Sequence, residues 1–207
     1  MIRLRSFAPF VPYLSILVGL VVFHSVWVTL IFYHVGMILY LVFNWEGKQG
    51  EFSLSVKNIC LGAVAILFGI FGGVFLYFLW PFLGIALDLG EALTRLGLSG
   101  SSWIVFILYF SLVNPVLEEL YWRGYLGKDA SSPVVQDFLF SGYHIIILAI
   151  FVGIPWLLVV FIVLSGTAWL WRQFTRISGS LLLSSISHMA ADLTVILVIY
   201  HYSGMRL

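Results

Sequence analysis

Residues 7–45, FAPFVPYLSILVGLVVFHSVWVTLIFYHVGMILYLVFNW, decide the fold class, because these 39 residues contain no Lys, Arg, Asp or Glu. As one helix they would extend for about 58 Å, whereas the hydrocarbon core of a bilayer is about 30 Å thick. The stretch therefore predicts two membrane helices, at about 8–23 and 26–43, with a break near His24 and Ser25.

The composition of the whole chain also indicates a membrane protein. Hydrophobic residues make up 62% of its 207 residues and charged residues only 9%, and the mean hydropathy is +1.09. Because a soluble domain carries about 25% charged residues, we expect one integral membrane domain over residues 1–207. With a net charge of +1 and no basic patch, the chain has no sign of a nucleic-acid partner. Its single cysteine, Cys60, excludes an internal disulfide.

Further apolar runs predict five more membrane helices, at about 59–80, 101–126, 133–151, 154–171 and, after Ser178-Gly179, 180–200. The helix at 133–151 would begin at Pro133, since proline suits the first helical turn. Between the runs, Asp88, Glu91 and Arg95 recur at helical spacing among leucines, which predicts an amphipathic segment at the membrane surface. The expected fold class is thus an all-α polytopic bundle of about seven transmembrane helices.

Basic residues distribute unequally between the two sides of such a bundle. One side would receive Arg3, Arg5, Lys48, Lys57, Arg123, Lys128, Arg172 and Arg176, and the other side Arg95 and Arg206. Because cytoplasmic loops carry an excess of Lys and Arg, we expect a cytoplasmic N-terminus. In a prokaryote the membrane would be the plasma (inner) membrane.

Three predicted helices place ionisable side chains inside the membrane, where such residues are costly and usually functional. They are Glu118, Glu119 and Arg123 in one helix, His144 in the next, and His188 and Asp192 in the last. Counted from the cytoplasmic helix ends, Glu118, His144 and His188 would lie about 12, 16 and 14 Å deep. Their similar depths predict one cytoplasm-facing intramembrane cavity.

Spacing within the helices predicts local pairs. Glu119 and Arg123 are four residues apart with the acid first, the favourable order for a helical ion pair. Glu118 lies about 100° around the helix from Glu119, so we expect the two acids not to share a partner. His188 and Asp192 are also four apart.

Ionisable groups inside the membrane occur in several classes of intramembrane protease, and the sequence lacks the motifs of three of these classes. It contains no H-E-x-x-H zinc motif, and Val163 stands where the rhomboid G-x-S-G pattern before Ser165-Gly166 requires glycine. The paired aspartate motifs of presenilin-type proteases are also missing.

One stretch on each of these three helices carries a motif. Glu118-Glu119-Leu-Tyr-Trp-Arg123-Gly124 has the pattern E-E-x-x-x-R-G, Phe140-Ser-Gly-Tyr-His144 has F-x-x-x-H, and His188-Met-Ala-Ala-Asp192 has H-x-x-x-D. The three motifs resemble those of the CPBP family of CAAX proteases and bacteriocin-processing enzymes, which includes the Ras-converting CAAX endopeptidase and whose last motif is H-x-x-x-(N/D), where many members have Asn. The resemblance covers about residues 114–195, and the catalytic core would span about 101–200.

This resemblance implies an intramembrane endopeptidase that hydrolyses a membrane-associated peptide or protein, with a CAAX-like or lipidated substrate as one option. Glu118 would activate a water that His144 also holds, and His188 and Asp192 would face the scissile carbonyl. Asp192 would have to be protonated or else orient His188, and Arg123 would hold Glu119. The expected partners are membrane lipid and a peptide or protein substrate.

Two alternatives remain open from the residues. The first is a zinc-dependent version of the same protease, with Glu118, His144 and His188 as ligands, although we expect no tightly bound cofactor. The second is a non-catalytic immunity or transport protein on the same fold.

Overall fold

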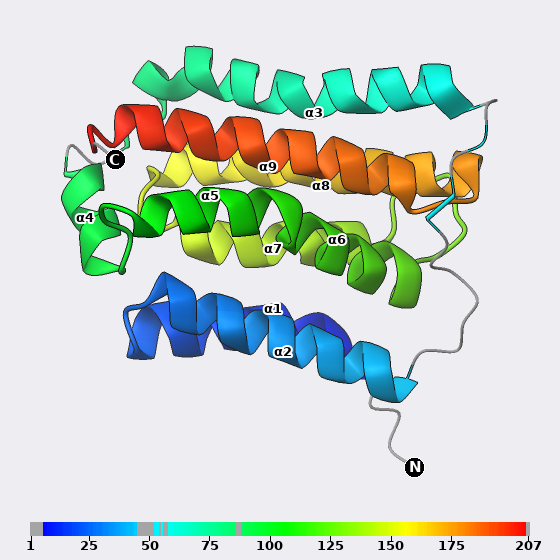
Figure 1. Ribbon diagram of the computed structural model, residues 1–207, viewed down its shortest axis with the longest axis horizontal. Coiled ribbons are helices and arrows are strands. Elements are labelled where there is room, and N and C mark those ends of the chain that lie inside the picture. The colour runs from blue at the N-terminus through cyan, green and yellow to red at the C-terminus, as the bar shows by residue number, and fades with distance from the viewer. Residues whose placement is uncertain (1–5, 45–51, 54, 56–57, 86–87, 206–207) are drawn as a thin grey trace.

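The computed structural model describes residues 6–44, 52–53, 55, 58–85 and 88–205. Every regular element in these residues is a helix, and the long helices run side by side (Figure 1). Of the basic residues used for orientation, Arg3, Arg5, Lys48, Lys57 and Arg206 lie outside the described residues.

The apolar stretch that begins the chain forms a helical hairpin, as predicted. A 3₁₀ turn (Ala8–Phe10), α1 (Val11–Ile16) and a π-helical turn (Leu17–Val22) form its first arm, and α2 (Val26–Asn44) forms its second. His24 lies in the reversal with a φ of 49°, so the predicted break near His24 and Ser25 is confirmed.

The middle of the chain also follows the prediction. α3 spans Ile59–Leu79 and ends in a 3₁₀ turn, Trp80–Phe82, at Pro81. The short helix α4, Leu89–Arg95, lies across one end of the bundle (Figure 1). Its predicted charge spacing is realised in two exposed ion pairs, from Arg95 to Glu91 at 2.7 Å and to Asp88 at 3.2 Å.

The helix expected at 101–126 is divided into three consecutive parts. α5 spans Ser102–Leu112, α6 spans Asn114–Glu119, and a π-helical turn, η6, spans Leu120–Tyr125. Pro115 lacks the N–H that would continue α5, which explains the interruption at Val113. Both glutamates of the first motif thus lie between two irregularities of one membrane helix.

The last three predicted helices exist with shifted boundaries. α7 spans Val135–Leu148, so the predicted start at Pro133 is wrong; the Asp137 side chain instead accepts the Val134 N–H at 2.9 Å and caps the helix. α8 spans Ile154–Ser178, seven residues beyond its predicted end at 171. α9 spans Leu182–Tyr202 after a turn at Gly179, whose φ is 69°.

Five helical segments in the described residues are long and apolar enough to cross a membrane: Val26–Phe43, Ile59–Phe82, Ser102–Tyr125, Ile154–Ser178 and Leu182–Tyr202. Two further apolar helices, Ala8–Val22 and Val135–Leu148, are shorter. The all-helical membrane fold is therefore confirmed, whereas the predicted number of seven spans is matched only when the two shorter helices are included.

α3 packs closely along α9 (Figure 1). Gly69 and Gly73 of α3 are buried, and a side chain at Gly69 would meet the Ser187 carbonyl and Ala190. Small residues four apart let membrane helices approach closely. This contact fixes the position of α9, which carries His188 and Asp192.

Candidate active site

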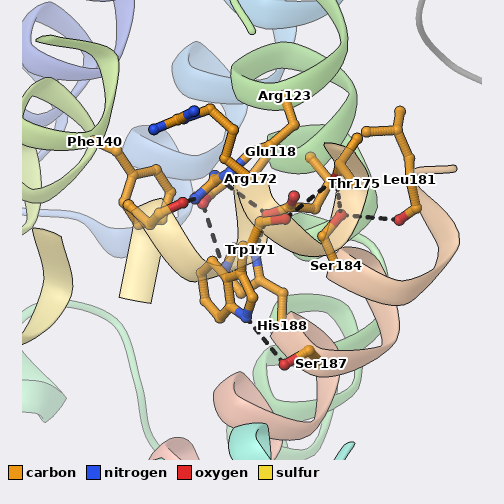
Figure 2. Close-up of polar contacts among 12 residues, drawn as sticks. Glu118, Arg123, Phe140, Trp171, Arg172, Thr175, Leu181, Ser184, Ser187 and His188 are labelled. Atoms are coloured by element: carbon orange, nitrogen blue, oxygen red, sulfur yellow. Dashed lines mark hydrogen bonds and ion pairs between the residues drawn. The ribbon is translucent and has the colours of Figure 1, made fainter. Parts of the chain in front are cut away.

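The two adjacent glutamates of α6 both point into the protein interior, where Glu118 is 2% exposed and Glu119 is fully buried. Buried carboxylates require partners, because burying an uncompensated charge is costly. Their partners come from α2, η6, α7 and α9 (Figure 2 shows Glu118 with part of this cluster).

Glu118 uses its two carboxylate oxygens differently. The hydroxyl groups of Tyr33 and Tyr143 each lie 2.9 Å from Oε1 and donate hydrogen bonds to it. The other oxygen, Oε2, is buried without a hydrogen-bond partner among the described residues. It faces Nε2 of His188 at 3.7 Å.

Glu119 serves two positively polarised partners with one oxygen. Its Oε1 lies 3.2 Å from Nη1 of Arg123 and 2.9 Å from Nδ1 of His188. The Arg123 guanidinium also lies over the Phe140 ring, 4.4 Å from its centroid. The predicted Glu119–Arg123 pair is confirmed.

His188 lies between the two glutamates, so the prediction that they share no partner is wrong. The ring bridges the 100° between their directions because its two nitrogens point opposite ways: Nδ1 to Glu119 and Nε2 toward Glu118. Nε2 also lies 3.5 Å from Oδ1 of Asp192, as expected from the i,i+4 spacing. Trp171 of α8 stacks on the imidazole at 3.9 Å between centroids, and its own Nε1–H donates to Ser187 Oγ at 3.0 Å (Figure 2).

His144 joins this cluster from α7. Its Nδ1 lies 2.8 Å from the Phe140 carbonyl. A carbonyl oxygen only accepts, so Nδ1 carries the proton and Nε2 of the neutral ring is an acceptor. The Phe140 ring lies 4.7 Å from the imidazole of His144 and 6.0 Å from that of His188, and so contacts both.

Asp192 is held by a residue that the sequence analysis did not select. The Asn114 Nδ2 donates to Asp192 Oδ2 at 3.3 Å, while the Asn114 Oδ1 lies 3.0 Å from Nε2 of buried His34. Nε2 of His34 must therefore carry a proton, and its Nδ1 accepts from the Tyr109 hydroxyl at 2.8 Å. In this row of hydrogen bonds, from Tyr109 through His34 and Asn114, each group donates to the next one toward Asp192.

Sequence reasoning also missed Tyr33 and Tyr143. Tyr143 lies inside the F-x-x-x-H motif, directly before His144, so its position offered a signal. Tyr33 and His34 lie on α2, some 80 residues before Glu118, and no motif marks them.

The donor set can be tested against a metal. Among the described residues, no group of three or more His, Cys, Asp or Glu side chains is arranged to hold a metal ion. The residues suggested for zinc, Glu118, His144 and His188, are therefore not arranged as a ligand set.

Comparison with known proteins matched one family model, described as type II CAAX prenyl endopeptidase Rce1-like, to residues 100–194. Neither the curated proteins nor the solved structures gave a match to this chain. The matched stretch contains α5, α6, η6, α7, α8 and most of α9, and with them all three motifs.

Proposed function

Residues 100–194 belong to the Rce1-like, type II CAAX prenyl endopeptidase family, and from this premise we propose that the chain is a glutamate-dependent intramembrane endopeptidase. The observation that carries the proposal is the free Oε2 of buried Glu118, which faces Nε2 of His188 at 3.7 Å. A carboxylate with one occupied and one free oxygen, opposite an imidazole, is suited to act as a general base.

In the proposed reaction, Glu118 Oε2 takes a proton from a water molecule as the water oxygen bonds to the scissile carbonyl carbon. The carbonyl electron pair moves to its oxygen, where a His188 N–H stabilises the negative charge. The C–N bond then breaks, and Glu118 returns the proton to the leaving amine. Nε2 of His144, the acceptor nitrogen, accepts a hydrogen bond from the second O–H of the water and so holds the water in place, without taking its proton.

Asp192 acts in this proposal as an ionised orienting group. Its Oδ2 accepts from the Asn114 amide, and its Oδ1 faces His188. Both nitrogens of His188 face carboxylate oxygens, an arrangement that favours an N–H on each. Of the two options for Asp192, we therefore propose that it orients His188 and does not itself donate.

We propose a membrane-associated peptide with a CAAX-like, prenylated C-terminus as the substrate. The description of the matched family names prenyl endopeptidases. The many apolar side chains exposed on the helices are suited to contact with lipid. The substrate chain would approach the cluster from the membrane, where its lipid is already dissolved.

The test is cleavage of a CAAX peptide, with and without a farnesyl group, by the purified protein in lipid nanodiscs. Glu118→Gln should abolish cleavage and keep the thermal midpoint, because the amide oxygen still accepts from both phenols. Glu91→Gln, an exposed acid of α4, is the matched control and should cleave normally. Retained cleavage by Glu118→Gln would refute Glu118 as the base; no cleavage by the unaltered protein would favour the non-catalytic alternative.

The same assay examines metal dependence. Since the described residues offer no grouped metal ligands, we expect cleavage to survive a strong chelator. Activity that is lost on chelation and restored by zinc would favour the zinc-dependent alternative.

A further inference from the structure

One oxygen of Glu118 accepts two phenol hydroxyls from different helices. Tyr33 comes from α2 and Tyr143 from α7, and both rings are almost fully buried. A carboxylate oxygen has two lone pairs, so these donors occupy the hydrogen-bonding capacity of Oε1. The chemistry of Glu118 is thereby confined to Oε2.

The two phenols are held by the packing of their rings. The Tyr143 ring stacks on Trp122 and on His144, at centroid distances of 6.0 and 4.1 Å. The Tyr33 ring packs against Tyr143 at 5.7 Å, and their hydroxyl oxygens lie 3.2 Å apart. The hydroxyl groups are therefore positioned independently of Glu118 and can fix its rotamer.

Tyr33 lies outside the part of the chain that matches the family. Residues 100–194 include Glu118 and Tyr143, whereas α2 precedes them and packs on α1, which in turn contacts α7 (Figure 1). A hairpin without any motif thus places a donor on the buried carboxylate.

We propose that Tyr33 is a positioning residue of the active site, which together with Tyr143 holds Glu118 Oε1 and so directs Oε2 to the reacting water. This inference rests on the proposed role of Glu118 as the base. It makes the α1–α2 hairpin part of the catalytic machinery and not only a lipid-facing cover. Because the phenols act on the base and not on the substrate, their loss should lower turnover without weakening substrate binding.

The test compares Tyr33→Phe, Tyr143→Phe and the double variant in the farnesylated peptide assay. Hydrogen bonds to a charged group contribute enough for a kcat loss of about 10- to 100-fold in each single variant, with KM within about twofold. We expect the double variant to lose more than the product of the two single effects, because one remaining phenol still restrains the carboxylate in part, whereas the double variant leaves it unrestrained.

Tyr121→Phe is the matched control. Tyr121 is fully buried and donates to the Ala8 carbonyl at 2.6 Å, so this variant also removes a phenol bond to the first helical arm, away from Glu118. It should lower the thermal midpoint and leave kcat unchanged. If Tyr121→Phe lowered kcat as much as Tyr33→Phe, the effect would be general loosening of the hairpin and the inference would fail.

Two outcomes separate this inference from the proposed function. If Glu118→Gln is inactive while Tyr33→Phe keeps full kcat, the positioning role is wrong and the base assignment stands. If Glu118→Gln remains active, the base assignment itself is wrong. Should Tyr33→Phe not fold, Tyr143→Phe tests the same oxygen, and an unchanged kcat there overturns the inference.

Discussion

At Glu119 a single carboxylate oxygen joins α6, η6 and α9. It contacts Arg123 of η6 and His188 of α9, and both acid and guanidinium are almost completely buried. Among the described residues, no cation lies within hydrogen-bond distance of Glu118, one residue earlier, and its Oε2 has no hydrogen-bond partner. This difference supports the proposal that the two adjacent glutamates divide a structural task and a chemical one between them.

Removing either partner of the buried pair should destabilise the protein strongly. Glu119→Gln or Arg123→Ala leaves a buried charge uncompensated, which costs about 3–5 kcal/mol. Because the side chains of both partners are almost completely buried, the magnitude for a buried pair applies here and not the about 0.3–0.5 kcal/mol of an exposed helical pair. Thermal unfolding in detergent measures the loss, with Glu118→Gln as the reference; equal midpoints for Glu118→Gln and Glu119→Gln would contradict the division of tasks.

Asn114 offers a second test at the residue scale. Asn114→Ala removes the donor to Asp192 and the acceptor for His34, so we expect kcat to fall about tenfold. Ser111→Ala, one turn earlier, removes a buried hydroxyl without a hydrogen-bond partner among the described residues and should be neutral. Equal activity of the two variants would show that the chain of donors from Tyr109 does not support Asp192.

Sequence reasoning predicted the local pairs of the site and missed its long-range partners. The Glu119–Arg123 pair and the His188–Asp192 neighbours follow from the helical period alone, because i and i+4 share one face. Tyr33 and His34 could not be found this way. The α2 sequence is mostly apolar and has no distinct polar face, so no local pattern shows which tyrosine faces a carboxylate 85 residues away. The prediction that Glu118 and Glu119 have separate partners failed for the same reason. It considered only the helix that carries both glutamates, whereas α9 supplies the imidazole of His188, whose two nitrogens face both acids.

At the scale of elements, the end of α8 was predicted wrongly. The sequence predicted a helix end at residue 171, with Arg172 outside the helix on the cytoplasmic side, but Arg172 lies inside α8 and is 3% exposed. Its guanidinium forms two hydrogen bonds to Asp137, at 3.0 and 2.7 Å, and also donates to the carbonyls of Ala130 and Ser132. A buried arginine that binds another segment is indistinguishable in sequence from one that ends a membrane helix, so α8 was predicted seven residues too short.

The contact of α3 with α9 gives a prediction at this scale. Gly69→Ala would press a methyl group on the Ser187 carbonyl and Ala190, next to His188, and overpacking of this kind costs about 1–3 kcal/mol. We expect a lower thermal midpoint and a lower kcat. Gly72→Ala is the control, because nothing lies within 4 Å of the added methyl group. If both variants behave alike, α3 does not set the position of α9.

At the scale of the whole molecule, the described connections lie at two ends of the bundle. The turns from η6 to α7 and from α8 to α9 are at one end, together with Lys128 and Arg176, whereas α4 and Arg95 are at the other (Figure 1). Ser53 N–H donates to Ser180 Oγ at 3.0 Å, so the segment before α3 reaches the first of these ends. Hydrophobic runs bounded by charged residues predicted this up-and-down order correctly, since membrane thickness limits each run.

The structure changes the charge count behind the predicted orientation, because Arg123 and Arg172 are neutralised by buried acids. Without them, six basic residues remain on the side of Lys128 against two on the side of Arg95, and the bias still has the same sign. We therefore predict that the end with Lys128 is cytoplasmic.

Single-cysteine labelling of intact cells tests this orientation in a Cys60→Ser background. Cys60 is exposed at the start of α3 and would otherwise react itself. Ser99→Cys places an exposed thiol beyond α4, and Asp129→Cys places one between η6 and α7. A membrane-impermeant maleimide should label Ser99→Cys directly and Asp129→Cys only after permeabilisation. The reverse pattern would mean that the molecule has the opposite orientation, with the proposed catalytic cluster around Glu118, which lies nearer the Asp129 end, in the outer half of the bilayer. A substrate whose prenyl group enters from the cytoplasmic leaflet would then have to cross the membrane to reach Glu118, and the proposed CAAX substrate would lose its physical basis.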